Sequence, residues 1–110
     1  MEKAVLISEN EFTKIFELDD IRVVFSKAYD EDSKLHFIVS SIPEIKELGV
    51  MHIQFPFTFK TEKQRDKGFK KMDELFALAY INNAKRFIIS NQEKAKQEEA
   101  KKQQSQELKN

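Results

Sequence analysis

Residues 51–59 alternate without interruption between apolar and polar positions. Because successive side chains of a strand point to opposite faces, the apolar positions share one face: Met51, Ile53, Phe55, Phe57 and Phe59. The opposite face carries His52, Gln54 and Thr58 together with Pro56, which has no N–H to donate to a neighbouring strand. The pattern therefore predicts a strand at the edge of an antiparallel sheet, with its polar side in water.

Two earlier segments have the same periodicity. Residues 21–29 place four apolar side chains on one face: Ile21, Val23, Phe25 and Tyr29. Residues 35–42 place three on one face: Leu35, Phe37 and Val39. An acidic turn with the sequence YDEDSK separates these two segments, and Pro43 ends the second. Together with residues 51–59 they predict a meander of three antiparallel strands.

The first 20 residues allow two interpretations. Ser8 and Glu11 have the spacing of a capping box, and three apolar residues then fall on one face of a short helix: Phe12, Ile15 and Phe16. A strand would instead align Phe12 with Phe16 and Leu18, and would leave Asp19–Asp20 as the turn of a hairpin. We favour the helix for residues 9–18 and keep the strand as the alternative.

A helix is expected to begin at Thr61, because Thr61 and Gln64 also have the spacing of a capping box. Apolar residues then recur at helical spacing: Phe69, Met72, Phe76, Ala79 and Tyr80. After Ile89 the composition becomes polar and charged, and residues 90–110 contain a single large apolar residue, Leu108. We predict that this tail is a solvated helix or disordered.

These elements define a fold class. The sheet has one apolar face and the helix one apolar stripe, so packing them together buries both. We predict an α+β fold in which a three- to four-stranded antiparallel meander packs on one long C-terminal helix in two layers, with residues 1–89 as one domain and residues 90–110 as the tail. The other sheet face keeps apolar residues that need cover, which predicts a homodimer: Val24, Ile38, Ile42 and Val50.

The composition argues against catalysis. The chain has no cysteine, two glycines and two histidines, so thiol chemistry, a glycine-rich phosphate loop and a closed zinc site all lack their residues. His36 and His52 are expected on the face opposite the phenylalanine row. A calcium loop in the acidic turn would need a glycine and a glutamate where Leu35 and Ser41 stand. We expect no enzymatic activity, no metal and no cofactor.

Location follows from what the chain lacks. The first residues, MEKAVLIS, do not have the long apolar run and the cleavage site of a signal peptide. No stretch approaches the roughly 20 apolar residues that cross a bilayer. We therefore expect a cytoplasmic protein that has no membrane partner.

Charge is unevenly distributed, although the 19 basic and 19 acidic side chains of the whole chain cancel. Residues 60–71 carry six Lys or Arg against two Asp or Glu, a net charge of +4. Positive charge at a helix N-terminus opposes the helix dipole, so local stability does not explain this segment. On a helix, four of its lysines form a ridge beside the end of the phenylalanine strand: Lys63, Lys67, Lys70 and Lys71. With Lys60 and Phe59 they are the candidate binding residues.

Two functions are compatible with this layout. We predict a small non-catalytic binding module, a protein-interaction accessory factor of the adaptor, chaperone or inhibitor type, which acts as a homodimer. Its phenylalanine row is mainly core, since three exposed rings would form a patch that monomers seldom tolerate. The alternative is a single-stranded nucleic-acid binder, in which Phe59 stacks on a base and the lysine ridge contacts phosphates. The zero net charge favours a protein partner.

Overall fold

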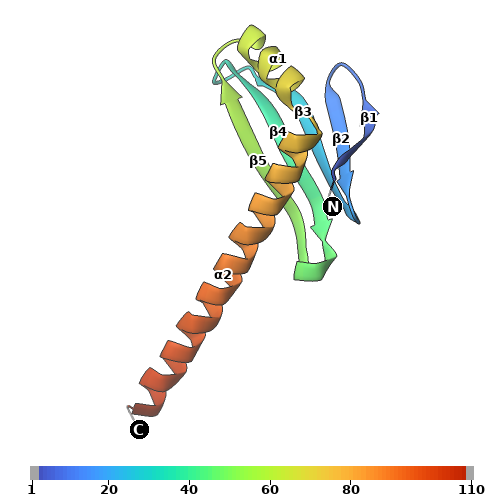
Figure 1. Ribbon diagram of the computed structural model, residues 1–110. Helices are drawn as coiled ribbons and strands as arrows, with labels where there is room; N and C mark the ends of the chain where they lie inside the picture. Colours follow the sequence, from blue (N-terminus) through green and yellow to red (C-terminus); the bar gives the residue numbers. More distant parts are fainter. Residues whose placement is uncertain (1–2, 109–110) are drawn as a thin grey trace.

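The computed structural model describes the backbone of residues 3–108 and the side chains of residues 3–98. Within that part of the chain the elements follow in the order β1 (Val5–Glu9), β2 (Thr13–Leu18), β3 (Ile21–Asp30), β4 (Leu35–Ile45), the 3-10 turn η1 (Lys46–Leu48), β5 (Val50–Phe59), α1 (Glu62–Lys71) and α2 (Glu74–Leu108). The strands form one antiparallel sheet in chain order (Figure 1). The predicted α+β meander is confirmed, with five strands instead of three to four.

The additional strands come from residues 5–18, where the favoured helix is wrong and the alternative strand is correct. β2 lies between β1 and β3, and it buries alternate side chains: Lys14, Phe16 and Leu18. Leu18 pairs with Ile21, so Asp19 and Asp20 form the two-residue turn that the alternative requires. Hydrogen-bonded neighbours on both sides of β2 outweigh the local helix signal, since tertiary pairing overrides a weak propensity.

The residues of the expected capping box, Ser8 and Glu11, do not begin a helix. Ser8 lies in β1 and pairs with Ile15. The turn between β1 and β2 is closed by Asn10, whose side-chain oxygen accepts hydrogen bonds from the N–H groups of Phe12 (2.9 Å) and Thr13 (2.8 Å). This is the local side-chain-to-backbone bonding by which asparagine stabilises turns.

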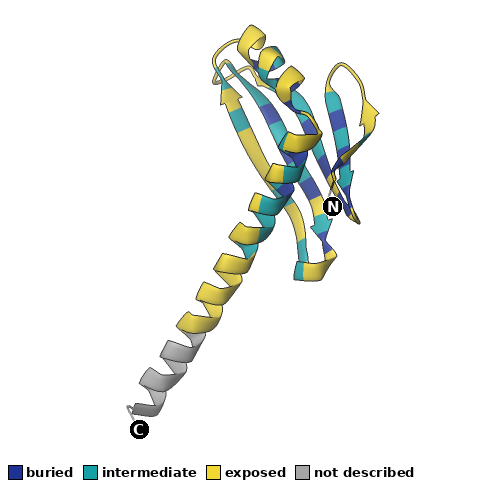
Figure 2. Ribbon diagram, viewed as in Figure 1, coloured by how far each residue is buried: buried dark blue, intermediate teal, exposed yellow. Residues whose placement is uncertain are grey.

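The hydrophobic core lies between the helices and one side of the sheet, which we call the covered face. Figure 2 shows the buried segments where strands and helices meet. The core contains fully buried residues from three strands and from α2: Phe16, Val23, Phe25, Ile38, Ile42, Ala77 and Ile81. Removing a large apolar side chain from water contributes roughly 1.5–3 kcal/mol, so this layer is the main source of stability.

The prediction assigns the alternating side chains of β4 to the wrong faces of the sheet. Ile38 and Ile42, expected on the uncovered side, are fully buried in the core. Residues that pair across an antiparallel ladder share a face, and the buried Phe25 pairs with Ser40, which puts the even-numbered positions of β4 on the covered face. Both alternating sets of β4 are apolar, so periodicity alone could not tell them apart. Val50 pairs with the buried Ile45, which leaves Val24 as the one correct residue of the four.

β5 is an edge strand, as predicted. Its apolar row faces the helices, but burial along the row is uneven. Ile53, Phe57 and Phe59 pack against the core, whereas Met51 is 65% exposed and Phe55 54% exposed. The phenylalanine row is therefore core at one end and protein surface in its middle.

The C-terminal helix begins where the capping box predicts but is interrupted once. The Thr61 side chain accepts a hydrogen bond from the N–H of Gln64 at 3.1 Å. Met72 leaves helical geometry with ψ at 96°. Asp73 then begins the second helix, because its carboxylate accepts a hydrogen bond from the N–H of Phe76 at 2.9 Å. The break lets α1 pack on β4 and β5 while α2 packs on β2 and β3.

α2 has a packed half and an exposed half. Ala84 and Ile88 still contact the core, but every side chain from Ile89 to residue 98 is exposed. Gln92 makes a last contact, donating a hydrogen bond from Nε2 to the carbonyl of Leu48 at 3.0 Å. Beyond Gln92, α2 continues over residues 93–108, a segment that we call the stalk (Figure 2). The tail is thus helical to Leu108, and residues 109 and 110 lie outside the described part. No helix among the described residues is long and apolar enough to cross a membrane.

Candidate functional site

The side of the sheet that faces away from the helices, here called the open face, carries a continuous uncharged surface. The register of the strands aligns its residues in three rows: Ile15–Val24–Ser41–Gln54, Thr13–Ser26–Val39–Pro56 and Ala28–Phe37–Thr58. No charged residue occupies any of these eleven positions, and charged residues of the same face, Glu17, Arg22 and Asp30, lie in the rows beyond them. Charged residues make up 35% of the chain, so about four would be expected here by chance, and more on a face in water.

The open face combines apolar side chains with hydroxyl groups. Ile15, Val24, Phe37 and Val39 are each partly exposed, and Thr and Ser residues lie between them. Hydroxyl groups can donate and accept hydrogen bonds, while aromatic and branched side chains gain from leaving water. Depletion of charge together with an aromatic residue is typical of interface cores between proteins. Sequence reasoning missed this surface because it follows from the register of four strands.

The lysine ridge predicted from the sequence is present on α1. Lys63, Lys67 and Lys70 are exposed and lie beside one another with Glu62 and Asp66. Two further predicted residues, Lys60 and Lys71, are exposed at either end of α1.

Phe59 does not join the ridge at the surface. It is half-buried against the core, and its ring lies so close to α1 that a Cβ atom on Gly68 would be 3.1 Å from it. A glycine in the middle of a helix costs about 1 kcal/mol relative to alanine, and here it makes room for the ring. The structure therefore brings three of the predicted lysines together, Lys63, Lys67 and Lys70, places Lys60 and Lys71 at the two ends of α1, and packs the predicted aromatic beneath Gly68.

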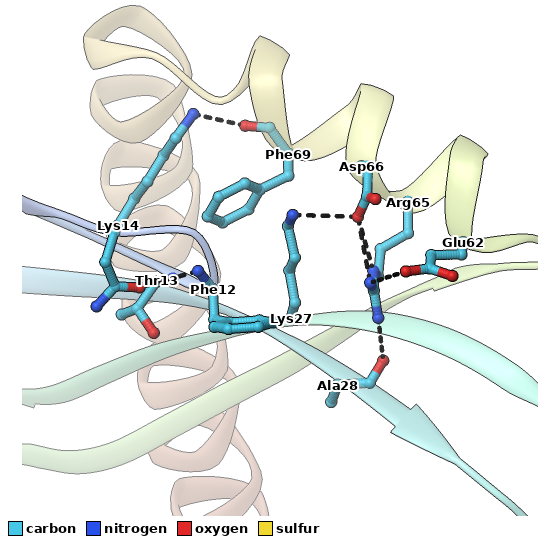
Figure 3. A network of polar contacts seen from close by, with 10 residues as sticks. Phe12, Thr13, Lys14, Lys27, Ala28, Glu62, Arg65, Asp66 and Phe69 are labelled. Carbon is cyan, nitrogen blue, oxygen red and sulfur yellow. Dashed lines mark hydrogen bonds and ion pairs between the residues drawn. The ribbon is translucent and has the colours of Figure 1, made fainter.

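Other cations already neutralise the acidic residues of α1 (Figure 3). Lys27 on β3 lies 3.1 Å from the Asp66 carboxylate, and Arg65 lies 3.2 Å from the same carboxylate and 3.7 Å from that of Glu62. The hydrogen bond from Lys27 lowers the pKa of Asp66 most, and Arg65 lowers it further. Among the described side chains, no ion pair involves a lysine of the ridge. The positive charge of the ridge is consequently not compensated within that part of the chain.

Two lysines that the sequence reasoning did not single out hold α1 on the sheet. Lys14 is 7% exposed, and its Nζ donates hydrogen bonds to the carbonyl oxygens of Phe69 (2.6 Å) and Met72 (3.1 Å) at the end of α1. Lys14 and Lys27 each place Nζ 4.7 Å from the centre of the Phe69 ring. The sequence did contain a signal for their burial, because Lys14 and Lys27 each stand where the alternation of their strand calls for an apolar residue. Their role is structural.

The two histidines do not form a joint site. His36 pairs with Phe59, so it lies on the same face as the phenylalanine row and not opposite to it, as was expected. Its ring stacks on Tyr29 with centroids 4.6 Å apart. His52 is exposed and lies seven residues from Phe59 along β5, roughly 23 Å away in an extended strand. Among the described residues, no three His, Cys, Asp or Glu side chains are grouped to hold a metal ion.

A second uncharged surface lies beside the edge strand. Because α2 packs over β2 and β3, a groove of about 540 Å³ remains between α2 and β5, lined by Ile53, Gln54, Phe55, Phe57, Tyr80, Asn83, Ala84 and Phe87. The hydroxyl group of Tyr80 lies 2.5 Å from that of Ser40, which is also 2.8 Å from the carbonyl oxygen of Phe55. The Tyr80 ring therefore forms one side of the groove, and its hydroxyl group is already hydrogen-bonded.

No family model, no curated protein and no solved structure matches this chain. Its function has to follow from the surfaces themselves. The eleven aligned positions of the open face and the lining of the groove carry no charge, and the lysine ridge presents positive charge.

Proposed function

We propose that this chain is a non-catalytic protein-interaction module of the adaptor, chaperone or inhibitor type, and that the open face of its sheet is the partner-binding surface. The observation that supports this is the absence of charge from eleven neighbouring positions of a chain that is 35% charged. Lysine or glutamate on a sheet face in water has no energetic cost. On a face that a partner protein covers the same charge is unfavourable, because a charge without a partner is costly to remove from water.

The chemistry of the open face indicates the kind of partner. Phe37 and Val39 lie on β4, and the hydroxyl residues Thr58 and Ser26 pair directly with them. An interface that forms and dissociates mixes apolar and polar area in this way. The partner surface we propose is uncharged as well, with apolar side chains to match Phe37 and Val39.

Site-specific crosslinking tests this proposal in the cells that naturally make the protein. A photoreactive amino acid at Val39 should give one defined adduct with another protein. The matched control is the same group at Gln64, which is exposed on α1 and outside the open face. Ser41→Lys in the Val39 background should abolish the adduct, because it introduces a charge on the same face, two residues from Val39. No adduct from Val39, or the same adduct from Gln64, would reject the open face as the partner site.

One observation favours a second candidate function, the binding of single-stranded nucleic acid. Five exposed lysines of α1 and its borders have no ion-pair partner in the described part of the chain, and phosphates would supply the missing charge. Phe59 is packed beneath Gly68, so binding would depend on phosphate contacts more than on stacking.

Oligonucleotide binding at different salt concentrations separates the two functions. A nucleic-acid binder should show affinity at about 50 mM salt, and Lys67→Gln with Lys70→Gln should reduce the log–log slope by roughly 0.7 for each phosphate that is no longer neutralised. The protein-interaction proposal expects no measurable binding of the wild-type chain at that salt concentration. Binding with the expected reduction of the slope would establish the second function instead.

A further inference from the structure

The groove between β5 and α2 is lined by two large aromatic side chains that are more than half exposed. Phe87 on α2 is 68% exposed, and Phe55 on β5 is 54% exposed. The floor is aromatic as well, since the Phe57 ring lies 5.3 Å from Phe55 and 6.3 Å from Tyr80. An isolated chain would keep these rings in contact with water, which monomeric proteins seldom tolerate in a contiguous patch.

The edge strand beside the groove is poorly suited to accept an additional strand. Pro56 has no N–H, so it fits this ladder only where its nitrogen faces the free edge and its neighbours bond to β4. The free edge therefore lacks a donor near its middle. His52 has φ at 58°, a left-handed conformation that interrupts the extended backbone near the start of β5. An occupant of the groove has to be held by its side chains.

The groove is equally unsuited to a small polar molecule. Specific ligand pockets use a few convergent polar groups to orient the ligand. Here the Tyr80 hydroxyl is bonded to Ser40, and the remaining polar side chains of the lining are the amides of Gln54 and Asn83. An apolar protein surface is the better match.

The absence of charge points to a second copy of the chain. Across a two-fold axis the same surface meets itself, so residues near the axis approach their own equivalents and like charges there would repel one another. β5 contains no Asp, Glu, Lys or Arg over its ten residues, and none lines the groove on the α2 side. The same surface also holds both a projecting ring, Phe87, and a hollow beside it. That combination lets each copy insert Phe87 into the groove of the other.

We propose that two copies of this chain form a symmetric dimer in which the β5–α2 grooves face each other and Phe87 of each copy fills the groove of its partner. The size is adequate. β5 is roughly 33 Å long, and the sheet and helix layers together are about 20 Å deep. The resulting footprint of roughly 660 Å² approaches the ~800 Å² of accessible surface that each partner buries in a standard interface. Apart from Gln54, which lies on both surfaces, the open face remains free in this dimer.

Sedimentation equilibrium of the full chain over a wide concentration range tests this arrangement. The wild type should sediment at twice the mass of the chain. Phe87→Glu should raise the dissociation constant of the dimer at least about tenfold, because it places two like charges inside the interface. The matched control is Leu75→Glu, since Leu75 lies on the same helix, is 75% exposed and does not line the groove. It should leave the dissociation constant within about twofold of the wild-type value.

Circular dichroism shows whether each variant is folded. If Phe87→Glu fails to fold, Asn83→Lys provides the same test from an exposed position of the groove. A wild type that is monomeric at all concentrations would overturn the inference, and so would a Phe87→Glu or Asn83→Lys dimer as strong as the wild type. Val39→Lys separates this inference from the proposed function and should leave the dimer intact. If Val39→Lys alone dissociates the dimer, the copies meet through the open face and the groove assignment is wrong.

Discussion

The two faces of this sheet are built from the same strands but have different tasks. Phe25 and Val24 are neighbours on β3, yet Phe25 is fully buried under the helices, whereas Val24 is half-buried on the open face. Ile38 and Val39 show the same contrast on β4. Burial by α1 and α2 explains why the covered face is apolar. It does not explain why the eleven aligned positions of the open face carry no charge, and we attribute that to the proposed partner.

The largest expected difference between the two faces is at Phe25 and Val24. The Phe25 ring contacts three other aromatic rings, those of Phe16, Phe76 and Tyr80, at centroid distances of 5.5–5.9 Å. Phe25→Ala should cost about 3–5 kcal/mol of unfolding free energy, because it leaves a cavity in the core. Val24→Ala should cost about 1 kcal/mol or less. Urea denaturation measures both, and similar losses would mean that the open face is packed as tightly as the core.

The phenylalanine row provides the same comparison within one strand. Phe57 packs against the core, but Phe55 is more than half exposed. Phe57→Ala should reduce the unfolding free energy by about 2–3 kcal/mol, and Phe55→Ala by less than about 1 kcal/mol. If the proposed dimer forms, measuring at chain concentrations below its dissociation constant keeps contacts between copies out of the result. Equal losses would show that the burial gradient along β5 is wrong.

Lys14 tests how α1 is held on the covered face. Lys14→Met keeps the length of the side chain but leaves the carbonyl groups of Phe69 and Met72 without their donor. We expect a loss of about 1–2 kcal/mol, the usual cost of buried polar groups without partners. Lys63→Met, at an exposed position of α1, should change stability by about 0.5 kcal/mol or less. If the two substitutions have equal effects in thermal unfolding, the Lys14 contacts do not stabilise the fold.

The stalk should contribute least to stability. Deleting residues 93–110 removes side chains that, up to residue 98, are all exposed. The unfolding free energy should stay within about 0.5 kcal/mol of the full chain. Deleting residues 91–110 also removes the hydrogen bond from Gln92 to Leu48, and it should cost at most about 1 kcal/mol more. A larger loss from the shorter deletion would contradict a solvated stalk and the predicted domain limit at residue 89.

How much of this could be read from the sequence depended on how local each signal was. The Thr61 cap and the edge strand β5 were predicted correctly, because a capping box and a strand with one polar side are short-range patterns. β2 was assigned to the wrong class because its pairing with β1 and β3 is not visible locally. The break at Met72 went unnoticed because Phe69, Met72 and Phe76 keep helical spacing across it.

The candidate sites, too, could be predicted from the sequence only where the signal was local. The lysine ridge lies within ten residues of one helix, so the sequence was enough to find it. The burial of Phe59 depends on Gly68 in α1, and the open face depends on the register of four strands. In β4 both alternating sets are apolar, so only the pairing of Phe25 with Ser40 decides which set is buried. Surfaces assembled from several strands are therefore the part that the sequence alone could not supply.

The most direct test of the central claim compares Val39→Lys with Ile38→Lys. These neighbours lie on opposite faces of β4, and Ile38 is fully buried. If the eleven aligned positions of the open face lack charge because a partner covers them, Val39→Lys should change the unfolding free energy by about 1 kcal/mol or less, the range of strand propensity. Ile38→Lys should cost more than about 4 kcal/mol, because it buries a charge in the core. A loss of several kcal/mol for Val39→Lys would show that folding itself requires an uncharged open face, and would contradict the account.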